Sequence, residues 1–325
     1  MPTYVGLDVH RSVCQATVIS EHGIKHVRLP NERQALRRFF TSLEGTEVAM
    51  EATYCWQPIY ELLEELGHRV RLAHPTRTRI IASARIKTDI RDSEALARLL
   101  ELDWLPEAYV PPKPIRDLRE LVRLHAFLTC EATRLKNKVH AELAKLGLRY
   151  GSNPFTKRGR CWLRGLSSRT INACLDVLDA VERKLRELKD EMRARAGDHP
   201  EAELLQTIPG VGLYTALTIV AELGEVTRFP SEKHVSSYAG LVPSVYQSAD
   251  KQRTGSITKQ GSALLRWALV QCAWMHVMHA PDSKLTRYFW RIAKRKGKCV
   301  AIVATAHKLL IVIYHMLLRG EPFRG

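Results

Sequence analysis

The first part of the chain alternates between short apolar strands and helices in an order that few folds share. Three strands joined by tight turns come first, and helix and strand then alternate. The expected strands cover residues 3–9, 13–19, 24–29, 47–51 and 69–73, and the expected helices cover about 31–43 and 57–66. A meander followed by alternating helices and strands is the order of an RNase H-like α/β domain, which we place at residues 1–110.

Four acidic residues occupy positions in these elements that packing does not explain. Asp8 lies within the first strand, opposite its apolar face, although strands disfavour aspartate. Glu51 ends the fourth strand, and Asp89 and Asp92 open a helix with a spacing that puts them on one face. Carboxylates gathered in one place need a cation, and their oxygens suit Mg²⁺, with Mn²⁺ as the alternative. The set predicts a metal site of the kind that assists phosphodiester cleavage. Taken alone, Asp89 and Asp92 equally fit the role of first-turn acids that complement a helix dipole.

The composition points to a polyanionic partner inside the cell. The net charge is +16 and the isoelectric point is near 9.7, which favours nucleic acid over a membrane surface. The seven cysteines show no C-x-x-C spacing, as expected for reduced thiols in a cytoplasm. The apolar stretch at residues 300–318 is interrupted by His307, Lys308 and His315. We therefore expect a cytoplasmic protein without a signal peptide or a membrane partner.

Residues 111–198 read as a helical linker and coiled coil. Three prolines between Pro111 and Pro114 break the chain before a long helix that ends at Gly147, and residues 149–168 read as a loop. Apolar residues then recur in steps of three and four from Ile171 to Met192, which is the pattern of a coiled-coil seam. A coiled coil, formed with a second subunit or within a hairpin, and a single helix packed on its own domain fit this pattern equally.

The last expected domain covers residues 199–325, is mainly α and opens on a helix-hairpin-helix pattern. Ile208-Pro-Gly-Val-Gly212 supplies a tight turn, and Gly210 and Gly212 would let backbone amides at the next helix N-terminus approach a phosphate. An ordinary connection between two helices is the alternative.

Short motifs recur from one end of the chain to the other. The last domain carries Gly-Leu-Val-Pro at 240–243, Gly-Ser-Ile-Thr-Lys-Gln-Gly at 255–261 and Leu-Arg at 265–266. Elsewhere the chain carries Gly-Leu-Asp at 6–8, Glu-Ala-Thr at 51–53, Lys-Thr-Asp-Ile-Arg-Asp at 87–92, Ile-Pro-Gly-Val-Gly at 208–212, Ala-His-Lys-Leu-Leu at 306–310 and Gly-Glu-Pro-Phe at 320–323. In this order the motifs resemble those of IS110-family transposases.

The resemblance implies a DNA transposase that moves an insertion sequence, with a RuvC-like Asp-Glu-Asp-Asp domain, a coiled coil and a transposase domain. It implies that Asp8, Glu51, Asp89 and Asp92 are catalytic metal ligands, and that Ser248 is a nucleophile that forms a covalent phosphoserine intermediate. Its implied partners are donor and target DNA and a noncoding bridge RNA. The implied assembly is a dimer or tetramer, in which one subunit's acids work with another's serine.

The nucleophile position departs from the family pattern. The family usually has Ser-Gly there, whereas this chain has Ser248-Ala249, and alanine cannot take the positive-φ conformations open to glycine. Ser244 therefore stays as a second candidate nucleophile. The histidine nearest to Ser248 in sequence is His234, so a metal rather than a local histidine is expected to activate the serine.

Basic residues near these sites predict contacts with nucleic acid. Lys251, Arg253 and Lys259 flank Ser248 and suit phosphate contacts. A second group is interleaved with aromatic residues, a mixture that suits stacking on bases, and an amphipathic helix with core aromatics fits it equally. This group comprises Arg287, Arg291, Lys294, Arg295, Lys296 and Lys298. A third stretch predicts an RNA-binding face and comprises Arg77, Arg79, Arg85, Lys87 and Arg91.

Three functions are compatible with the sequence. The resemblance favours a serine-dependent, metal-assisted DNA recombinase. A RuvC-like nuclease of the Holliday-junction type would use water as nucleophile and form no covalent intermediate. A non-enzymatic helix-hairpin-helix protein would bind nucleic acid with vestigial acids. Loss of activity in a folded Asp8→Asn variant would exclude the third function, and a covalent protein–DNA adduct separates the first from the second.

Overall fold

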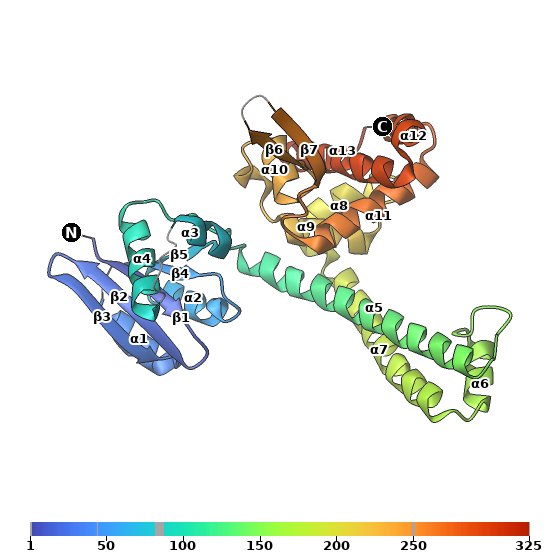
Figure 1. Ribbon diagram of the computed structural model, residues 1–325, viewed down its shortest axis with the longest axis horizontal. Helices are drawn as coiled ribbons and strands as arrows, with labels where there is room; N and C mark the ends of the chain where they lie inside the picture. Colours follow the sequence, from blue (N-terminus) through green and yellow to red (C-terminus); the bar gives the residue numbers. More distant parts are fainter. Residues whose placement is uncertain (1, 44, 82–87, 249–250, 325) are drawn as a thin grey trace. The chain divides into compact units, whose positions relative to one another are not determined.

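The computed structural model describes residues 2–43, 45–81, 88–248 and 251–324 and divides into two compact units (Figure 1). The units are Met1–Val110 and Pro111–Gly325. The second unit therefore contains both the helical segment and the C-terminal residues, and the expected boundary between 198 and 199 stays a prediction.

The first unit is built around one five-stranded sheet in the order β3-β2-β1-β4-β5. Its first three strands form an antiparallel meander, and the last two continue the sheet in parallel from β1. The strands are β1 (Tyr4–Val9), β2 (Val13–Ser20), β3 (Gly23–Pro30), β4 (Glu47–Glu51) and β5 (Arg69–Ala73). The expected RNase H-like α/β arrangement agrees with this mixed sheet.

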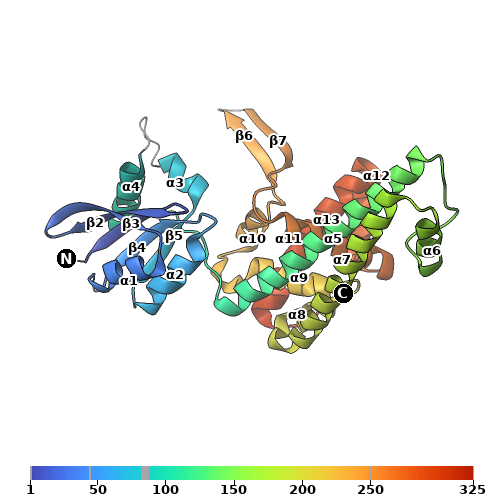
Figure 2. The ribbon, with the colours of Figure 1, turned by 90° about the horizontal axis from the view of Figure 1, so that it is seen from below.

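Helices cover both faces of this sheet (Figure 2). The helices α1 (Arg33–Thr41) and α2 (Trp56–Glu65) bury the apolar face of β1, whereas α4 (Asp89–Glu101) packs on the opposite face over β1 and β2. A short helix that the sequence did not predict, α3 (Pro75–Ile81), follows β5. Since side chains alternate along a strand, Val5 and Leu7 point into the α1–α2 core, and Gly6 and Asp8 lie on the α4 face.

Gly6 lets α4 lie directly against the centre of the sheet. A Cβ atom at this position would lie 1.9 Å from the carbonyl oxygen of Ser93 and 2.5 Å from the backbone nitrogen of Ala97, both in α4. The buried hydroxyls of Thr17 and Ser93 are hydrogen-bonded at 2.7 Å and fix the helix to β2 as well. This close approach brings the first turn of α4 to the end of β1, where Asp8 lies.

Substitution Gly6→Ala is therefore expected to lower the free energy of unfolding of the first unit by about 1–3 kcal/mol, because the added Cβ forces α4 away from the sheet. Urea unfolding would reveal this as a lower midpoint. Gly151→Ala serves as the control, since a Cβ there meets nothing within 4 Å. Equal midpoints for the two variants would contradict the close packing of α4 on β1.

The second unit begins with a helical hairpin (Figure 1). In it α5 (Lys113–Lys145) runs out and α7 (Arg169–Ala194) returns along it. Residues of the predicted seam, among them Ile171 and Leu178, are buried against α5 of the same chain. The structure thus shows the within-chain pairing among the alternatives that the sequence left open.

The predicted loop at 149–168 is wrong in part, because residues Lys157–Gly165 form α6. Thr156 caps the N-terminus of α6, and its hydroxyl accepts a hydrogen bond from the backbone N–H of Gly159 at 3.2 Å. Arg160 pairs with Asp179 and Glu182 of α7, and Arg164 with Asp176 and Asp179. Leu163 of α6 is fully buried in the core between α5 and α7, and the ion pairs hold the charged side of the helix to α7. The helix is short and rich in basic residues, so a single buried leucine leaves little apolar pattern in the sequence.

Six further helices form the main core of the second unit, together with the start of α5 and the end of α7. They are α8 (Pro200–Gln206), α9 (Leu213–Leu223), α10 (Glu232–Tyr238), α11 (Ala263–His279), α12 (Lys284–Lys296) and α13 (Lys298–Arg319). Short 3₁₀ turns lie at Ala196–Asp198 and Val226–Arg228. The expected mainly helical character of this region is confirmed.

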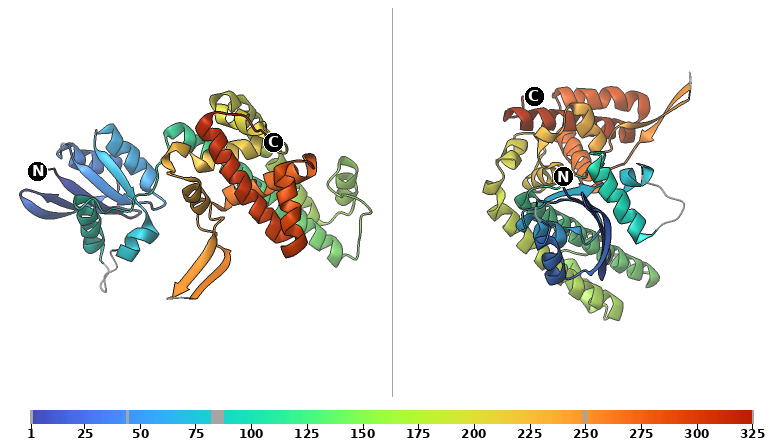
Figure 3. Two further views of the ribbon diagram at one scale, coloured as in Figure 1. Left: turned by 90° about the horizontal axis from the view of Figure 1, so that it is seen from above. Right: turned by 90° about the vertical axis from the view of Figure 1, so that its left-hand side faces the viewer.

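Between α10 and α11 a two-stranded hairpin projects from the helices (Figure 3). It consists of β6 (Pro243–Ser248) and β7 (Lys251–Ile257), paired antiparallel. The sequence did not predict it.

The last helix, α13, is long and apolar enough to cross a membrane on length and composition alone. However, Ile302, Leu309 and Ile313 are buried in the core of the second unit, and the apolar window is 50% buried within the structure. This is the position of a core helix.

Candidate active site

The ends of β1 and β4 place two carboxylates on the same face of the sheet. These strands are parallel and pair Leu7 with Met50, so the next position in that register sets Asp8 beside Glu51. Neighbours in register share a face, and Gly6 and Asp8 lie on the face that α4 covers. Asp8 and Glu51 therefore lie on the same side of the sheet.

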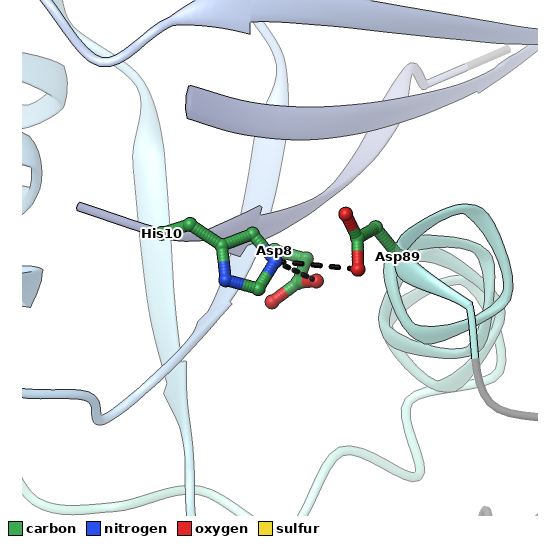
Figure 4. Close-up of side chains that lie close together, drawn as sticks. All are labelled: Asp8, His10 and Asp89. Carbon is green, nitrogen blue, oxygen red and sulfur yellow. Dashed lines mark hydrogen bonds and ion pairs between the residues drawn. The ribbon is translucent and has the colours of Figure 1, made fainter. Parts of the chain in front are cut away.

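Asp8, His10 and Asp89 form a compact group at this point (Figure 4). The Nε2 atom of His10 lies 3.1 Å from Oδ2 of Asp8 and 3.4 Å from Oδ1 of Asp89. One ligand atom from each of the three residues lies within 4.8 Å of the others. Asp89 opens α4, whose N-terminus is capped by the Thr88 hydroxyl, which accepts from the N–H of Arg91 at 3.3 Å.

Burial and neighbouring acids both disfavour the charged form of Asp8. Burial raises the pKa of Asp8 above its ordinary value of 3.8, His10 lowers it, and the charges of Asp89 and Asp92 raise it further. The side chain of Asp8 is only 16% exposed. Asp92 lies with Asp89 in the first turn of α4, and its negative charge is one of the lesser causes that raise the pKa of Asp8.

This donor set fits a divalent cation. Carboxylate oxygens are the usual ligands of Mg²⁺ and Mn²⁺, and a cation would offset the repulsion that disfavours the charged form of Asp8. Of the residues predicted from sequence, the structure brings Asp8 and Asp89 together, places Glu51 on the same face of the sheet as Asp8, and carries Asp92 in the same first turn of α4 as Asp89. Sequence reasoning missed His10. The sequence held a signal for it, because His10 follows Asp8 by two residues and alternation along a strand would put both side chains on the same side.

The predicted nucleophile lies at the end of the projecting hairpin. Ser248 is the last residue of β6, and it pairs in register with Lys251, the first residue of β7. Two positions earlier, Tyr246 pairs with Arg253, and both side chains are exposed, that of Tyr246 by 71%. Ala249, the departure from the family pattern, lies outside the described residues.

The alternative nucleophile, Ser244, has a bonding role inside the hairpin. Its hydroxyl donates to the carbonyl oxygen of Ser256 at 3.0 Å. A Cβ atom at Gly255 would lie 2.5 Å from that same hydroxyl, so the glycine makes room for it. These contacts give the Ser244 hydroxyl a structural role in the hairpin that does not require it to act as a nucleophile.

Motif residues fix the base of the hairpin. A Cβ atom at Gly240 would lie 2.0 Å from the carbonyl oxygen of Gln260. A Cβ atom at Gly261 would lie 2.0 Å from the carbonyl oxygen of Tyr238. Nη1 of Arg266 donates to three carbonyl oxygens, those of Ala239 at 3.2 Å, Gln260 at 3.3 Å and Gly261 at 3.1 Å. Lys259, predicted to contact phosphate, is exposed and has a φ of 55°. The Leu-Arg motif, to which sequence reasoning gave no role, thus holds the hairpin in place.

The two glycines of the helix-hairpin-helix pattern differ in their surroundings. A Cβ atom at Gly210 would lie 2.6 Å from backbone atoms of Met275 and His276 in α11, so this glycine is needed for packing. Gly212 precedes α9 and has nothing within 4 Å of such an atom. Of these two glycines, only Gly212 has open space around its Cα, and phosphate binding at its backbone stays a prediction.

The predicted basic contacts lie on exposed surface where the structure describes them. Arg77 and Arg79 lie on α3, whereas Arg85 and Lys87 lie outside the described residues. In the aromatic-containing group, Phe289 is buried against Trp274, with ring centroids 5.6 Å apart, while Trp290 is 46% exposed. The interpretation as an amphipathic helix with core aromatics therefore holds for Phe289, and contact of the exposed residues with nucleic acid stays a prediction. Its exposed cations are Arg287, Arg291, Lys294, Arg295 and Lys296 on α12 and Lys298 at the start of α13.

Comparisons with known proteins cover both units. A family model described as "Transposase", for the DEDD transposases of IS110 elements, matches residues 5–147, and one described as "Transposase IS116/IS110/IS902 family" matches residues 202–289. The transposase for insertion sequence element IS1328 of Yersinia enterocolitica is 26% identical, over 99% of this chain and 98% of its own length. The transposase for insertion sequence element IS1111A of Coxiella burnetii is also 26% identical, over 98% of this chain and 91% of its own length. The DEDD-type model covers the unit in which the acids gather, so the chain belongs to the IS110 family of insertion-sequence transposases, which cut and rejoin DNA.

Proposed function

We propose that this transposase moves its insertion sequence by metal-assisted strand transfer through a covalent bond between Ser248 and DNA. The observation that carries the proposal is the close group of Asp8, His10 and Asp89, with Glu51 next in register beside Asp8 and Asp92 in the same first turn of α4 as Asp89. A bound cation accommodates acids placed this close together more readily than packing does.

The four acids would hold Mg²⁺ or Mn²⁺ against a scissile phosphate. A bound ion neutralises phosphate charge and stabilises the leaving oxygen. Asp8 and Glu51 contribute from strands and Asp89 and Asp92 from a helix, so the ligands are fixed by packed elements. Such support holds a site more accurately than loops do.

Ser248 would attack the phosphorus through its hydroxyl oxygen. The oxygen–phosphorus bond forms as the bond from phosphorus to a deoxyribose oxygen breaks, the serine proton is lost to solvent, and the leaving oxygen takes up a proton. The phosphoserine keeps the energy of the diester, so a second strand can rejoin without ATP, and the sequence carries no P-loop motif. Arg253, exposed on β7, is suited to contact the neighbouring phosphates.

The partners of this reaction would be donor and target DNA and a noncoding bridge RNA. Exposed cations on α3, β7 and α12 support phosphate contacts with such partners. We further propose a dimer or tetramer, in which the acids of one subunit act with Ser248 of another.

A hydrolytic alternative is kept because the acidic group lies wholly within the first unit. An RNase H-like domain that holds a metal can use water as its nucleophile, and would then be a RuvC-like nuclease with no need for Ser248.

Trapping a covalent adduct tests the proposal. The full chain with Mg²⁺, bridge RNA and end-labelled donor DNA is expected to yield a labelled species that survives denaturing electrophoresis and disappears on proteolysis. A reaction containing EDTA is the control and should give no adduct. Cleaved DNA without any protein attached would refute the serine mechanism and support hydrolysis by water.

A further inference from the structure

We infer that His10 binds the catalytic divalent ion directly, together with Asp8 and Asp89, and that it makes the site prefer Mn²⁺ to Mg²⁺. The inference rests on the proposed function in one respect, because it assumes that the acids of the first unit hold a metal. It adds a nitrogen ligand to a site that the motifs describe only by its carboxylates.

The backbone around His10 is fixed, so its ring is held in place. β1 ends at Val9, and alternation puts the next residue on the same side as Asp8. The N–H of His10 donates to the carbonyl oxygen of Val13 at 2.9 Å, and its carbonyl oxygen accepts from Nδ2 of Asn31 at 2.8 Å. The side chain is 46% exposed, which leaves room for an ion to reach it.

The distances around His10 suit ligation. With bonds of about 2.1 Å, neighbouring ligand atoms on one ion lie about 3 Å apart. Nε2 of His10 lies 3.1 Å from an oxygen of Asp8 and 3.4 Å from an oxygen of Asp89, which come from a strand and a helix. Without an ion this nitrogen is hydrogen-bonded to Asp8. A cation that replaced the proton of this hydrogen bond would find all three ligands, with the remaining ring proton on Nδ1.

The nitrogen changes which ion the site accepts. Carboxylate oxygens alone suit Mg²⁺ and Mn²⁺ alike, whereas an imidazole nitrogen favours transition-metal ions. Mn²⁺ combines tolerance of oxygen ligands with the ability to bind imidazole. The ratio of its affinity to that of Mg²⁺ therefore reports the contribution of His10.

Pulsed electron paramagnetic resonance of Mn²⁺ bound to the full chain tests this directly. Wild-type protein is expected to show spin-echo modulation from a directly bound ¹⁴N nucleus, and labelling with [¹⁵N]histidine should change that modulation without any substitution. In His10→Asn the modulation should disappear, and calorimetry should show Mn²⁺ affinity reduced by at least about tenfold. The affinity for Mg²⁺ should fall less.

His22→Asn is the matched control, because His22 is an exposed histidine 3.6 Å from the carboxylate of Glu21 in the β2–β3 turn. It should leave both the modulation and the affinities unchanged. Mn²⁺ that binds the wild type without nitrogen modulation, or modulation that persists in His10→Asn, would overturn the role of His10 and leave the metal site standing. Failure of the wild type to bind either ion would instead overturn metal assistance itself.

Discussion

An Asp8→Asn variant is expected to lose DNA strand transfer by on the order of a thousandfold, while its metal-free form becomes more stable than the wild type. A metal ion contributes several kcal/mol to transition-state stabilisation, and each 1.36 kcal/mol is about tenfold in rate. Asn keeps the size of the side chain but removes the charge that binds the ion. Strand transfer on labelled donor and target DNA measures the loss.

The stability gain follows from the direction of the pKa shift. The folded-state pKa of Asp8 is raised, chiefly by burial, so the wild type is more stable while this carboxyl is protonated. That stability is lost as the pH rises from 3.8, the ordinary pKa of the carboxyl, through its raised pKa in the folded state. At neutral pH the neutral Asn side chain avoids the free-energy cost of burying a charged carboxylate. Thermal unfolding in EDTA should therefore show a higher midpoint for the variant than for the wild type.

Asp190→Asn is a suitable control for both measurements, since Asp190 is 71% exposed on α7 and pairs with Arg193. It should change neither activity nor midpoint appreciably. Full activity in Asp8→Asn would show that the acids of the first unit are not catalytic.

Ser248→Ala is expected to abolish both recombination and the covalent adduct while binding of RNA and DNA stays near normal. The substitution removes the attacking oxygen but no charge, and phosphate contacts dominate nucleic-acid affinity. Recombination and adduct assays measure the chemistry, and a filter-binding titration at fixed salt measures the affinity.

Ser244→Ala separates the two candidate serines. It removes the hydrogen bond to the carbonyl of Ser256 and should cost about 1 kcal/mol of stability, with the adduct still formed. The reverse result, with Ser244→Ala inactive and Ser248→Ala active, would make Ser244 the nucleophile. Cleavage that survives both substitutions would favour water.

The strands of the first unit and its helices α1, α2 and α4 were predictable, because burial gives their apolar residues a regular spacing in the sequence. β1 buries one face and α4 lies on the other, so Val5 and Leu7 alternate with Gly6 and Asp8 in the sequence itself. An acid within such a strand is visible as an exception. The need for glycine at position 6 was not visible, because it arises from atoms of Ser93 and Ala97, far away in sequence.

The β6–β7 hairpin was not predictable by the same reasoning. Val245 and Tyr246 are consecutive and both exposed, so neither face of β6 carries an apolar repeat. What fixes the hairpin is backbone packing at Gly240 and Gly261 and the hydrogen bonds of Arg266. Hydrophobic patterns contain no signal for contacts of this kind.

Because Asp8 lies on a strand and Asp89 on a helix, the proposed metal would be coupled to the fold. An ion bound by both side chains cross-links β1 to α4, and it can do so only while the helix lies against the sheet. Ligands that bind only the folded state stabilise it by mass action, by about 2.7 kcal/mol at a hundred times the dissociation constant. With the proposed ion bound, the concentration of divalent ions would set how firmly α4 is held to the sheet as well as whether the site can do chemistry, and a chelator would loosen the helix.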